Sequence, residues 1–446
     1  MSDTIAAIAT AHGSASISIV RLSGPEALSI ARRLAPHASF TPRYAELTSL
    51  FDTENELIDQ GLVLYFQAPR SFTGEEIVEF QCHGGMVVAQ TILETAVAHG
   101  ARIAEPGEFS KRAFLGGKID LSEAEAIAKL IEAKSLDAAR ILARQIKGEL
   151  GRFIEEAREE LLEAFAHSEV MIDYAEEDLP EDLFRRLHSR LIALEQKLQK
   201  IVESSERRKG LIEGFRVAIV GKPNAGKSSL LNALLRYERA IVSEIAGTTR
   251  DTIEEEIRIG SHIIRIIDTA GIRETEDRIE KIGVERSLDS VREADIVVAL
   301  FDRSRAWDEE DEQIFHLMQE EHDREWIVAL NKSDLPARID SSKLEAYAPL
   351  EISAKEDFTP LIRRLEEILD SYALDEELML ASARQIETVR EAASEIARAV
   401  GPLERGELEL FSYHLQEAVR KLGQITRPYE NEEMLDRMFG EFCLGK

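Results

Sequence analysis

The chain has 446 residues, of which 44% are hydrophobic and 31% are charged, a balance typical of a folded protein with about three domains and contrary to disorder. Its 84 acidic and 55 basic residues give a formal net charge of −29, which disfavours a protein that coats nucleic-acid phosphates. Cys82 and Cys443 are too few for a disulfide framework or a zinc cluster, so a reducing compartment is expected.

The start of the chain lacks the features of a secretory signal. Its first basic residue is Arg21, and the apolar stretch Ile5–Ala11 stops at His12 and Gly13. No apolar run approaches the ~20 residues of a membrane span. We therefore expect a cytoplasmic protein without membrane contact.

Hydrophobic periodicity divides the chain into α+β, helical and α/β segments. Residues 1–118 alternate in short runs typical of mixed strands and helices, and a helical pattern begins near Asp120 with Ser122 and Glu125 at capping-box spacing. From Phe215 onward, buried-strand runs alternate with helical segments, which predicts a doubly wound parallel sheet. Those runs are Phe215–Val220, Ile263–Ile267, Ile296–Phe301, Trp326–Leu330 and Leu350–Ile352.

A helical stripe resumes near Glu376, which suggests that an α/β unit is inserted into a helical domain. The predicted division is an N-terminal α+β domain over 1–118, a discontinuous helical domain over 119–213 and 373–446, and a Ras-like P-loop domain over 214–372.

The run Gly221-Lys-Pro-Asn-Ala-Gly-Lys-Ser228 fits the phosphate-loop motif between a predicted strand and a helix. Its main-chain N–H groups can wrap phosphates, Lys227 supplies a cation to the outer phosphates, and the Ser228 hydroxyl can bind Mg²⁺. The alternative, a glycine-containing surface turn, is disfavoured because further nucleotide-binding elements follow in order.

Three more motifs follow at strand ends or before a strand. A threonine of Gly247-Thr-Thr-Arg-Asp251 can complete the Mg²⁺ shell, and Asp268-Thr-Ala-Gly271 can meet the metal and the γ-phosphate. In Asn331-Lys-Ser-Asp334, the Asp334 carboxylate can accept the two N–H donors of guanine, which adenine lacks. Ser353-Ala-Lys355 can support the base, so the expected ligand is GTP.

Position 272 is Ile, where many regulatory GTPases carry the Gln that orients the attacking water. Another group must therefore orient the water and neutralise charge. Asn224 could hold a monovalent cation beside the phosphates, although the residue could instead only stabilise the turn.

In order, the four main motifs resemble those of translation-factor-like GTPases, and the whole chain resembles the family of MnmE-type (TrmE) tRNA modification GTPases. The wider resemblance rests on the joint order of several segments, none of which is specific alone. They are Asp3-Thr-Ile5, Val20-Arg-Leu-Ser-Gly-Pro25, Ser71-Phe-Thr-Gly-Glu75, His83-Gly-Gly85, Glu105-Pro-Gly-Glu-Phe-Ser-Lys-Arg-Ala-Phe114 and the terminal Cys443-Leu-Gly-Lys446.

The resemblance implies a homodimer that hydrolyses GTP as a conformational clock and forms a heterotetramer with an FAD-containing, MnmG-type partner. Together they would add an aminomethyl or carboxymethylaminomethyl group to C5 of the tRNA wobble uridine, using 5,10-methylene- or 5-formyl-tetrahydrofolate. The N-terminal domain would bind the folate and dimerise. Because the chain is acidic, we expect its own tRNA affinity to be modest and shared with the partner.

The resemblance also implies site residues. Mg²⁺ would contact Ser228 and Thr249, K⁺ would contact Asn224, Ser243, Ile245 and Thr248, and Glu280 would organise the attacking water as a catalytic residue with Asn224 and Lys227. The expected GTP contacts are Asn224, Ala225, Gly226, Lys227, Ser228, Ser229, Ser243, Glu244, Ile245, Ala246, Gly247, Thr248, Thr249, Asp268, Thr269, Ala270, Gly271, Asn331, Lys332, Asp334, Ser353, Ala354 and Lys355.

For folate, the matching positions are Arg21, Glu79, Lys118 and Lys446, whose charges suit a pterin ring and a glutamate tail. Without the resemblance each is an ordinary surface residue. Cys443 is expected to pack or to play a supporting role, because no neighbouring His would activate it.

Two other functions stay open at this point. The first is a ribosome-assembly switch, although the segment after the α/β unit has 15 acidic and 9 basic residues and so lacks a basic RNA-binding appendage. The second is a folate-dependent methyl-transfer enzyme with an incidental nucleotide switch.

Overall fold

The computed structural model describes residues 3–11, 13–173, 181–238, 255–267, 289–373, 378–427, 432–442 and 445. It forms two compact units, each made of several chain segments. The first contains Met1–Ile131, Ala143–Glu195 and Thr388–Lys446, and the second contains Glu132–Leu142 and Gln196–Glu387. The division into three domains remains a prediction, and the boundaries of the two compact units fall within its helical segments.

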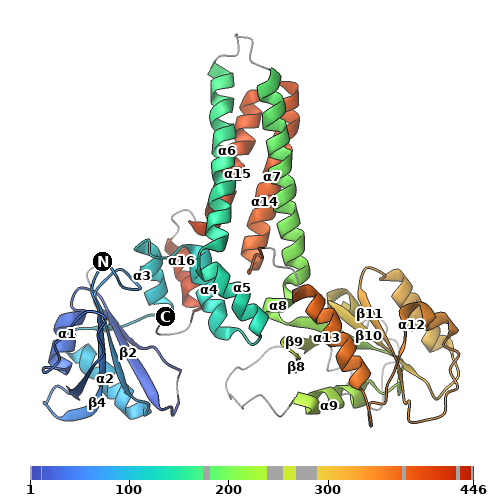
Figure 1. The fold of residues 1–446 in the computed structure, drawn as a ribbon, viewed down its shortest axis with the longest axis horizontal. Helices are drawn as coiled ribbons and strands as arrows, with labels where there is room; N and C mark the ends of the chain where they lie inside the picture. The colour runs from blue at the N-terminus through green and yellow to red at the C-terminus, as the bar shows by residue number, and fades with distance from the viewer. Residues whose placement is uncertain are drawn as a thin grey trace. The chain divides into compact units, whose positions relative to one another are not determined.

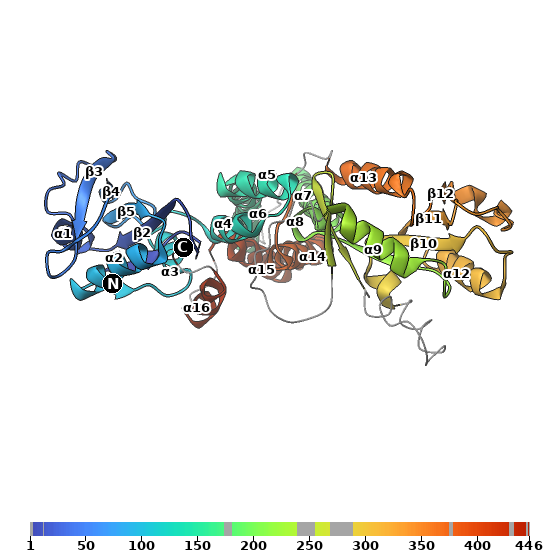
Figure 2. The same ribbon diagram turned by 90° about the horizontal axis from the view of Figure 1, so that it is seen from below.

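The first unit begins with a six-stranded sheet in the order β3-β4-β5-β2-β1-β6 (Figures 1 and 2). Neighbouring strands of this sheet are antiparallel, except that β1 and β6 are parallel. The strands are β1 (Ile5–Ile8), β2 (Ile17–Ser23), β3 (Glu46–Phe51), β4 (Leu57–Phe66), β5 (Ile77–His83) and β6 (Arg102–Ile103).

Helices α1 (Ala27–Leu34) and α2 (Met86–Ala98) contribute to the core on one face of this sheet. Buried side chains alternate along the central strands, as expected where one sheet face packs against helices. The opposite face presents Arg21 and Glu79, which are paired in the β2–β5 register.

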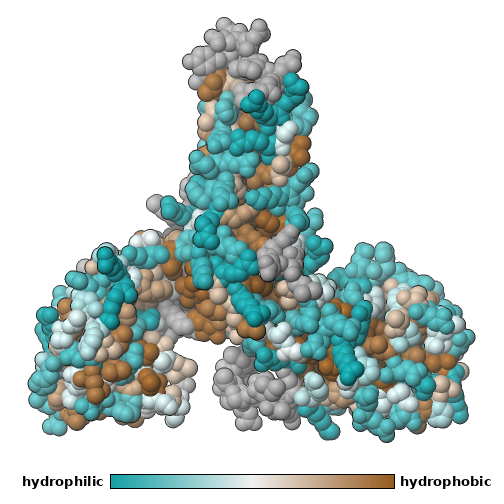
Figure 3. Space-filling view, in the orientation of Figure 1, coloured by the Kyte–Doolittle hydropathy of each residue, from teal (hydrophilic) through white to brown (hydrophobic). Residues whose placement is uncertain are grey.

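The rest of the first unit is helical. Its elements are α3 (Glu108–Leu115), α4 (Leu121–Glu132), α6 (Glu149–Asp173), α15 (Leu408–Thr426), α16 (Glu432–Gly440) and parts of α5 (Leu136–Ile146), α7 (Glu181–Arg208) and α14 (Ala383–Arg405). Ion pairs join the long helices, for example Arg190 on α7 with Glu163 on α6 at 2.8 Å. The visible face of this bundle is mostly hydrophilic (Figure 3).

The second unit contains the other six-stranded sheet, in the order β12-β11-β10-β7-β9-β8. Its strands are β7 (Phe215–Val220), β8 (Glu255–Ile259), β9 (His262–Ile266), β10 (Ile296–Asp302), β11 (Glu325–Asn331) and β12 (Leu350–Glu351). Its described helices include α8 (Gly210–Glu213), α9 (Lys227–Glu238), α12 (Glu309–Glu320), α13 (Thr359–Ala373) and the 3₁₀ helix η1 (Ser342–Tyr347), and the remaining parts of α5, α7 and α14 also belong to this unit.

This arrangement confirms the predicted doubly wound α/β fold, with one addition. All neighbouring strands are parallel except β8, an antiparallel edge strand that the periodicity had not revealed. Strand β10 is buried along its whole length because hydrophobic clusters cover the sheet on both faces. No helix among the described residues is long and apolar enough to cross a membrane.

Candidate functional site

The phosphate-loop motif connects the end of β7 to the start of α9, as its mechanism requires. Asn224 and Gly226 have φ angles of 63° and 106°, in the region that favours glycine. A Cβ added to Gly226 would lie 2.1 Å from Nδ2 of Asn331. The glycine is therefore required both by the backbone conformation and by the close approach of a neighbouring side chain.

Lys227 is the first residue of α9, and its ammonium group faces the loop. Nζ donates to the carbonyl oxygens of Gly221 at 2.5 Å and Lys222 at 3.0 Å. Burial lowers the pKa of Lys227 below its ordinary value. An anion beside this ammonium group would favour its charged form, which suits the lysine for binding phosphates.

A single buried amide joins the phosphate loop to the predicted base-binding segments. Asn331 ends β11 and is 2% exposed. Its Nδ2 donates to the carbonyl oxygen of Ala225 at 2.7 Å, while its Oδ1 accepts from the N–H of Ala354 at 2.9 Å. Three motifs far apart in the sequence thus meet at one side chain.

Lys332 makes a second connection to the loop. Its Nζ donates to the carbonyl oxygen of Asn224 at 2.9 Å and to Oδ2 of Asp302 at 2.6 Å. Burial raises the pKa of Asp302, but hydrogen bonds from Lys332 and Ser304 outweigh it and hold that pKa below its usual range. Sequence reasoning missed Asp302, although an aspartate at the end of a buried strand could have signalled it.

Asp334, the predicted guanine reader, is held by the next loop. Its Oδ1 accepts from Oγ of Ser353 at 2.8 Å, and that Oγ also accepts from the N–H of Glu356 at 3.2 Å. The serine therefore orients the carboxylate, which is how Ser353-Ala-Lys355 supports the predicted base site.

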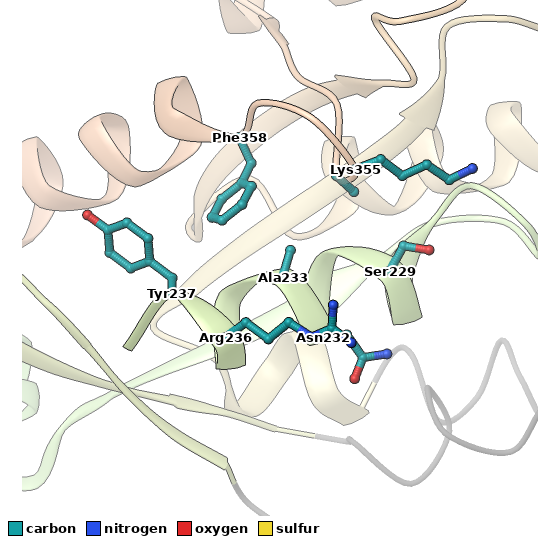
Figure 4. Close-up of a pocket in the computed structure, with 8 residues that line it drawn as sticks. Ser229, Asn232, Ala233, Arg236, Tyr237, Lys355 and Phe358 are labelled. Atoms are coloured by element: carbon teal, nitrogen blue, oxygen red, sulfur yellow. The ribbon is translucent and has the colours of Figure 1, made fainter. Parts of the chain in front are cut away.

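An open cavity of about 570 Å³ lies between α9 and the loop after β12 (Figure 4). Ser229, Ala354 and Lys355, which were predicted to contact GTP, contribute to it. The sequence analysis did not predict the other lining residues. Four of them share one face of α9, and the fifth comes from the loop after β12; none belongs to a nucleotide-binding motif. They are Asn232, Ala233, Arg236, Tyr237 and Phe358.

The remaining predicted nucleotide residues lie outside the described residues. They are Ser243, Glu244, Ile245, Ala246, Gly247, Thr248, Thr249, Asp268, Thr269, Ala270, Gly271 and Glu280. The same holds for Cys443 and Lys446 near the end of the chain. Their roles therefore stay predictions.

In the first unit, two of the predicted folate residues contact each other. Nε of Arg21 donates to Oε1 of Glu79 at 2.8 Å, and the Arg21 guanidinium lies 5.6 Å from the centre of the Phe109 ring. Lys118 packs against Gly74, where an added Cβ would lie 2.8 Å from its Cε. The site can thus offer a cation and a carboxylate, while the Phe109 ring is fully buried and supports the Arg21 guanidinium.

Comparison with known proteins identifies the family. The model of the MnmE helical domain matches residues 121–443, and that of the GTP-binding protein TrmE N-terminus matches residues 4–118. The chain belongs to the MnmE family. Its MnmE relatives include the tRNA modification GTPase MnmE of Sulfurovum sp., 63% identical over 100% of this chain and 99% of the relative.

Two other MnmE proteins are similar over nearly their whole length. The tRNA modification GTPase MnmE of Nitratiruptor sp. is 58% identical, covering 99% of this chain and 98% of the relative. That of Sulfurimonas denitrificans is 56% identical, covering 100% and 99%. The resemblance noted from the motifs is confirmed.

Proposed function

We propose that the chain binds GTP between the phosphate loop and the Asn331–Asp334 segment and hydrolyses it during tRNA modification. The observation that carries this proposal is the Asn331 amide, which bonds to both Ala225 and Ala354. This amide couples the loop for the phosphates to the loop for the base. The carboxylate of Asp334, oriented by Ser353, supports guanine recognition.

The bound nucleotide would carry Mg²⁺, held by Ser228 and Thr249, which neutralises charge on the β- and γ-phosphates. Ser228 is the second residue of α9, and its hydroxyl is a suitable hard oxygen ligand. K⁺ would be held by Asn224 with Ser243, Ile245 and Thr248. The exposed Asn224 side chain, on a loop whose backbone is fixed by Lys332, supports that role. Glu280 would position the attacking water.

We further propose that two copies of the chain act with an FAD-containing, MnmG-type partner in the cytoplasm. Their product would be a wobble uridine with an aminomethyl or carboxymethylaminomethyl group at C5, made from a tetrahydrofolate one-carbon unit. The Arg21–Glu79 pair, with Lys118 and Lys446, would hold the folate. Membership of a family of tRNA modification GTPases supports this proposal.

Base specificity and cation dependence test the nucleotide site directly. We expect the purified chain to hydrolyse GTP but not ATP, and to do so faster in K⁺ than in Na⁺. Asp334→Asn should lose GTP turnover and gain turnover of xanthosine triphosphate, because the amide can donate to the xanthine carbonyl. Equal turnover of ATP and GTP would contradict the guanine site, and equal rates in both cations would remove the K⁺ role.

A further inference from the structure

Lys222, the second residue of the phosphate-loop motif, has a buried ammonium group that is aimed at α12. Its side chain is 3% exposed, and Nζ donates to Oδ2 of Asp308 and to Oδ2 of Asp311, both at 2.6 Å. A lysine buried this completely requires compensation, and two carboxylates supply it here. The Lys222 ammonium group therefore forms ion pairs with the start of α12.

The two carboxylates also form the cap of α12. Oδ1 of Asp308 accepts from the N–H groups of Glu310 and Asp311, and Oδ2 of Asp311 accepts from the N–H of Asp308. Asp308 therefore uses one oxygen for the helix and the other for Lys222. This capping box makes the start of α12 a rigid anchor.

The main chain of Lys222 lies in the phosphate loop itself. Its carbonyl oxygen accepts from Nζ of Lys227 at 3.0 Å and from the N–H of Ala225 at 3.2 Å. Lys222 thus connects two parts of the site: its side chain binds the cap of α12, and its main-chain carbonyl oxygen binds Lys227. Lys332 and Asn331 support the next residues of the loop, Asn224 and Ala225.

Removal of the Lys222 cation would leave a strongly buried carboxylate without its partner. Asp311 is 1% exposed, and its Oδ1 has no hydrogen-bond partner among the described residues. Burial raises the pKa of Asp311, while the two ion pairs outweigh burial and raise the pKa of Lys222. The anchor therefore depends on both signs of charge being present.

We propose that Lys222 is a positioning residue, whose ion pairs with Asp308 and Asp311 fix the phosphate loop in its nucleotide-binding conformation. This rests on the proposed GTP function and adds a structural reason for affinity. A loop held in its binding conformation before the ligand arrives loses less conformational entropy on binding. The effect of the tether should therefore appear in nucleotide affinity more than in the rate of hydrolysis.

The test compares four variants of the full chain by the affinity for fluorescent GDP, by kcat and KM for GTP, and by the melting temperature without nucleotide. Lys222→Met should weaken GDP binding about tenfold, with kcat at saturating GTP changed less than about threefold. Lys222→Arg, which keeps the charge, should stay within about threefold of wild-type affinity. If Lys222→Met does not fold, Lys222→Met/Asp311→Asn still tests the tether, because it removes the cation together with the buried charge that would be left unpaired, while the asparagine keeps a side-chain oxygen for the N–H of Asp308.

Lys343→Met is the matched control. Lys343, in η1, forms an ion pair at 2.7 Å with Glu312 of α12, the helix that Lys222 also contacts. Because the Lys343 side chain is half exposed, its loss should leave nucleotide affinity unchanged. Failure of the wild-type chain to bind GDP would refute the proposed function. Wild-type binding together with unchanged affinity in folded Lys222→Met or in folded Lys222→Met/Asp311→Asn, whatever the melting temperature, would overturn the positioning role alone.

Discussion

The candidate nucleotide site and the candidate folate site are built in opposite ways. At the nucleotide site, side chains such as Asn331 and Lys332 hold main-chain atoms of the phosphate loop, so the loop is shaped before a ligand arrives. At the folate site, Arg21 and Glu79 lie on neighbouring antiparallel strands and bind each other. A folate that takes both groups must compete with their mutual ion pair.

Because of this difference, the two sites should respond differently to substitution. The nucleotide site depends on backbone geometry and buried polar bonds, so small steric changes should be severe. The folate site depends on the charges of partly exposed side chains, which solvent screens, so changes there should be milder. Three predictions, in decreasing order of effect, test this contrast.

Gly226→Ala should have the largest effect. Alanine at this position would have to adopt a φ angle of 106°, and its Cβ would lie 2.1 Å from Nδ2 of Asn331. Backbone strain and steric collision would therefore act together. We expect GDP affinity to fall at least about a hundredfold, from roughly 3 kcal/mol of strain and lost contacts. Titration with a fluorescent GDP measures it.

The control is Gly406→Ala in the first unit, where φ is 74° but no atom lies within 4 Å of the added Cβ. It should cost about 1 kcal/mol of unfolding free energy and leave GDP affinity unchanged. Near wild-type GDP binding by Gly226→Ala would mean that the loop is adaptable, and the contrast between the two sites would fail.

Glu79→Gln should have an intermediate effect, confined to the first unit. Loss of the carboxylate removes a charge-assisted acceptor for the ligand, so binding of 5-formyl-tetrahydrofolate should weaken about tenfold. GTP turnover should not change. Equilibrium dialysis gives the first value and a phosphate-release assay the second.

Glu94→Gln serves as the comparison, because Glu94 is an exposed carboxylate on α2 of the same unit. Folate binding by this variant should equal that of the wild type. Equal folate affinity in Glu79→Gln and the wild type would exclude Glu79 from the folate site.

The smallest effect concerns pH. Burial holds the pKa of Lys227 below 10.5 in the nucleotide-free fold, so between the two values the unfolded chain binds more protons. The contribution of Lys227 to the unfolding free energy therefore rises with pH in this window. Phosphates favour the charged lysine, so GDP binding should take up protons there and weaken a few-fold as pH rises.

Calorimetry in alkaline buffers of different ionisation enthalpy measures this proton uptake. The uptake should decrease as the pH is lowered, because a larger fraction of Lys227 is then already charged before GDP binds. Lys343→Met should give the same profile as the wild type. Absence of uptake throughout the alkaline window would show that Lys227 is not the group whose charge the nucleotide restores.

The sequence could predict the residues of the nucleotide site that belong to short motifs. Asn224, Lys227, Asn331, Asp334 and Ser353–Lys355 belong to short motifs at strand ends, and a parallel sheet brings such ends to one edge. Their mutual contacts confirm that edge, although their roles in GTP binding stay predictions.

Other features depend on strand order and helix placement, which local patterns do not contain. Asp302 contacts Lys332 because β10 lies next to β11 in the sheet. Lys222 follows β7, and it contacts the start of α12 because β10, which precedes α12, is the neighbour of β7. Strand β8 was missed because it is short, charged and antiparallel at an edge. The Arg21–Glu79 pairing required the β2–β5 register, which residue type alone does not determine.

The central claim is that nucleotide binding by this chain supports modification of the tRNA wobble uridine. Mass spectrometry of tRNA nucleosides tests it most directly, in a strain that lacks the chain and carries either the wild type or Lys227→Ala. We expect the aminomethyl and carboxymethylaminomethyl uridines to disappear on deletion, to return with the wild type and to stay absent with Lys227→Ala. Unchanged nucleosides after deletion would contradict the account and favour a GTPase switch without modification chemistry.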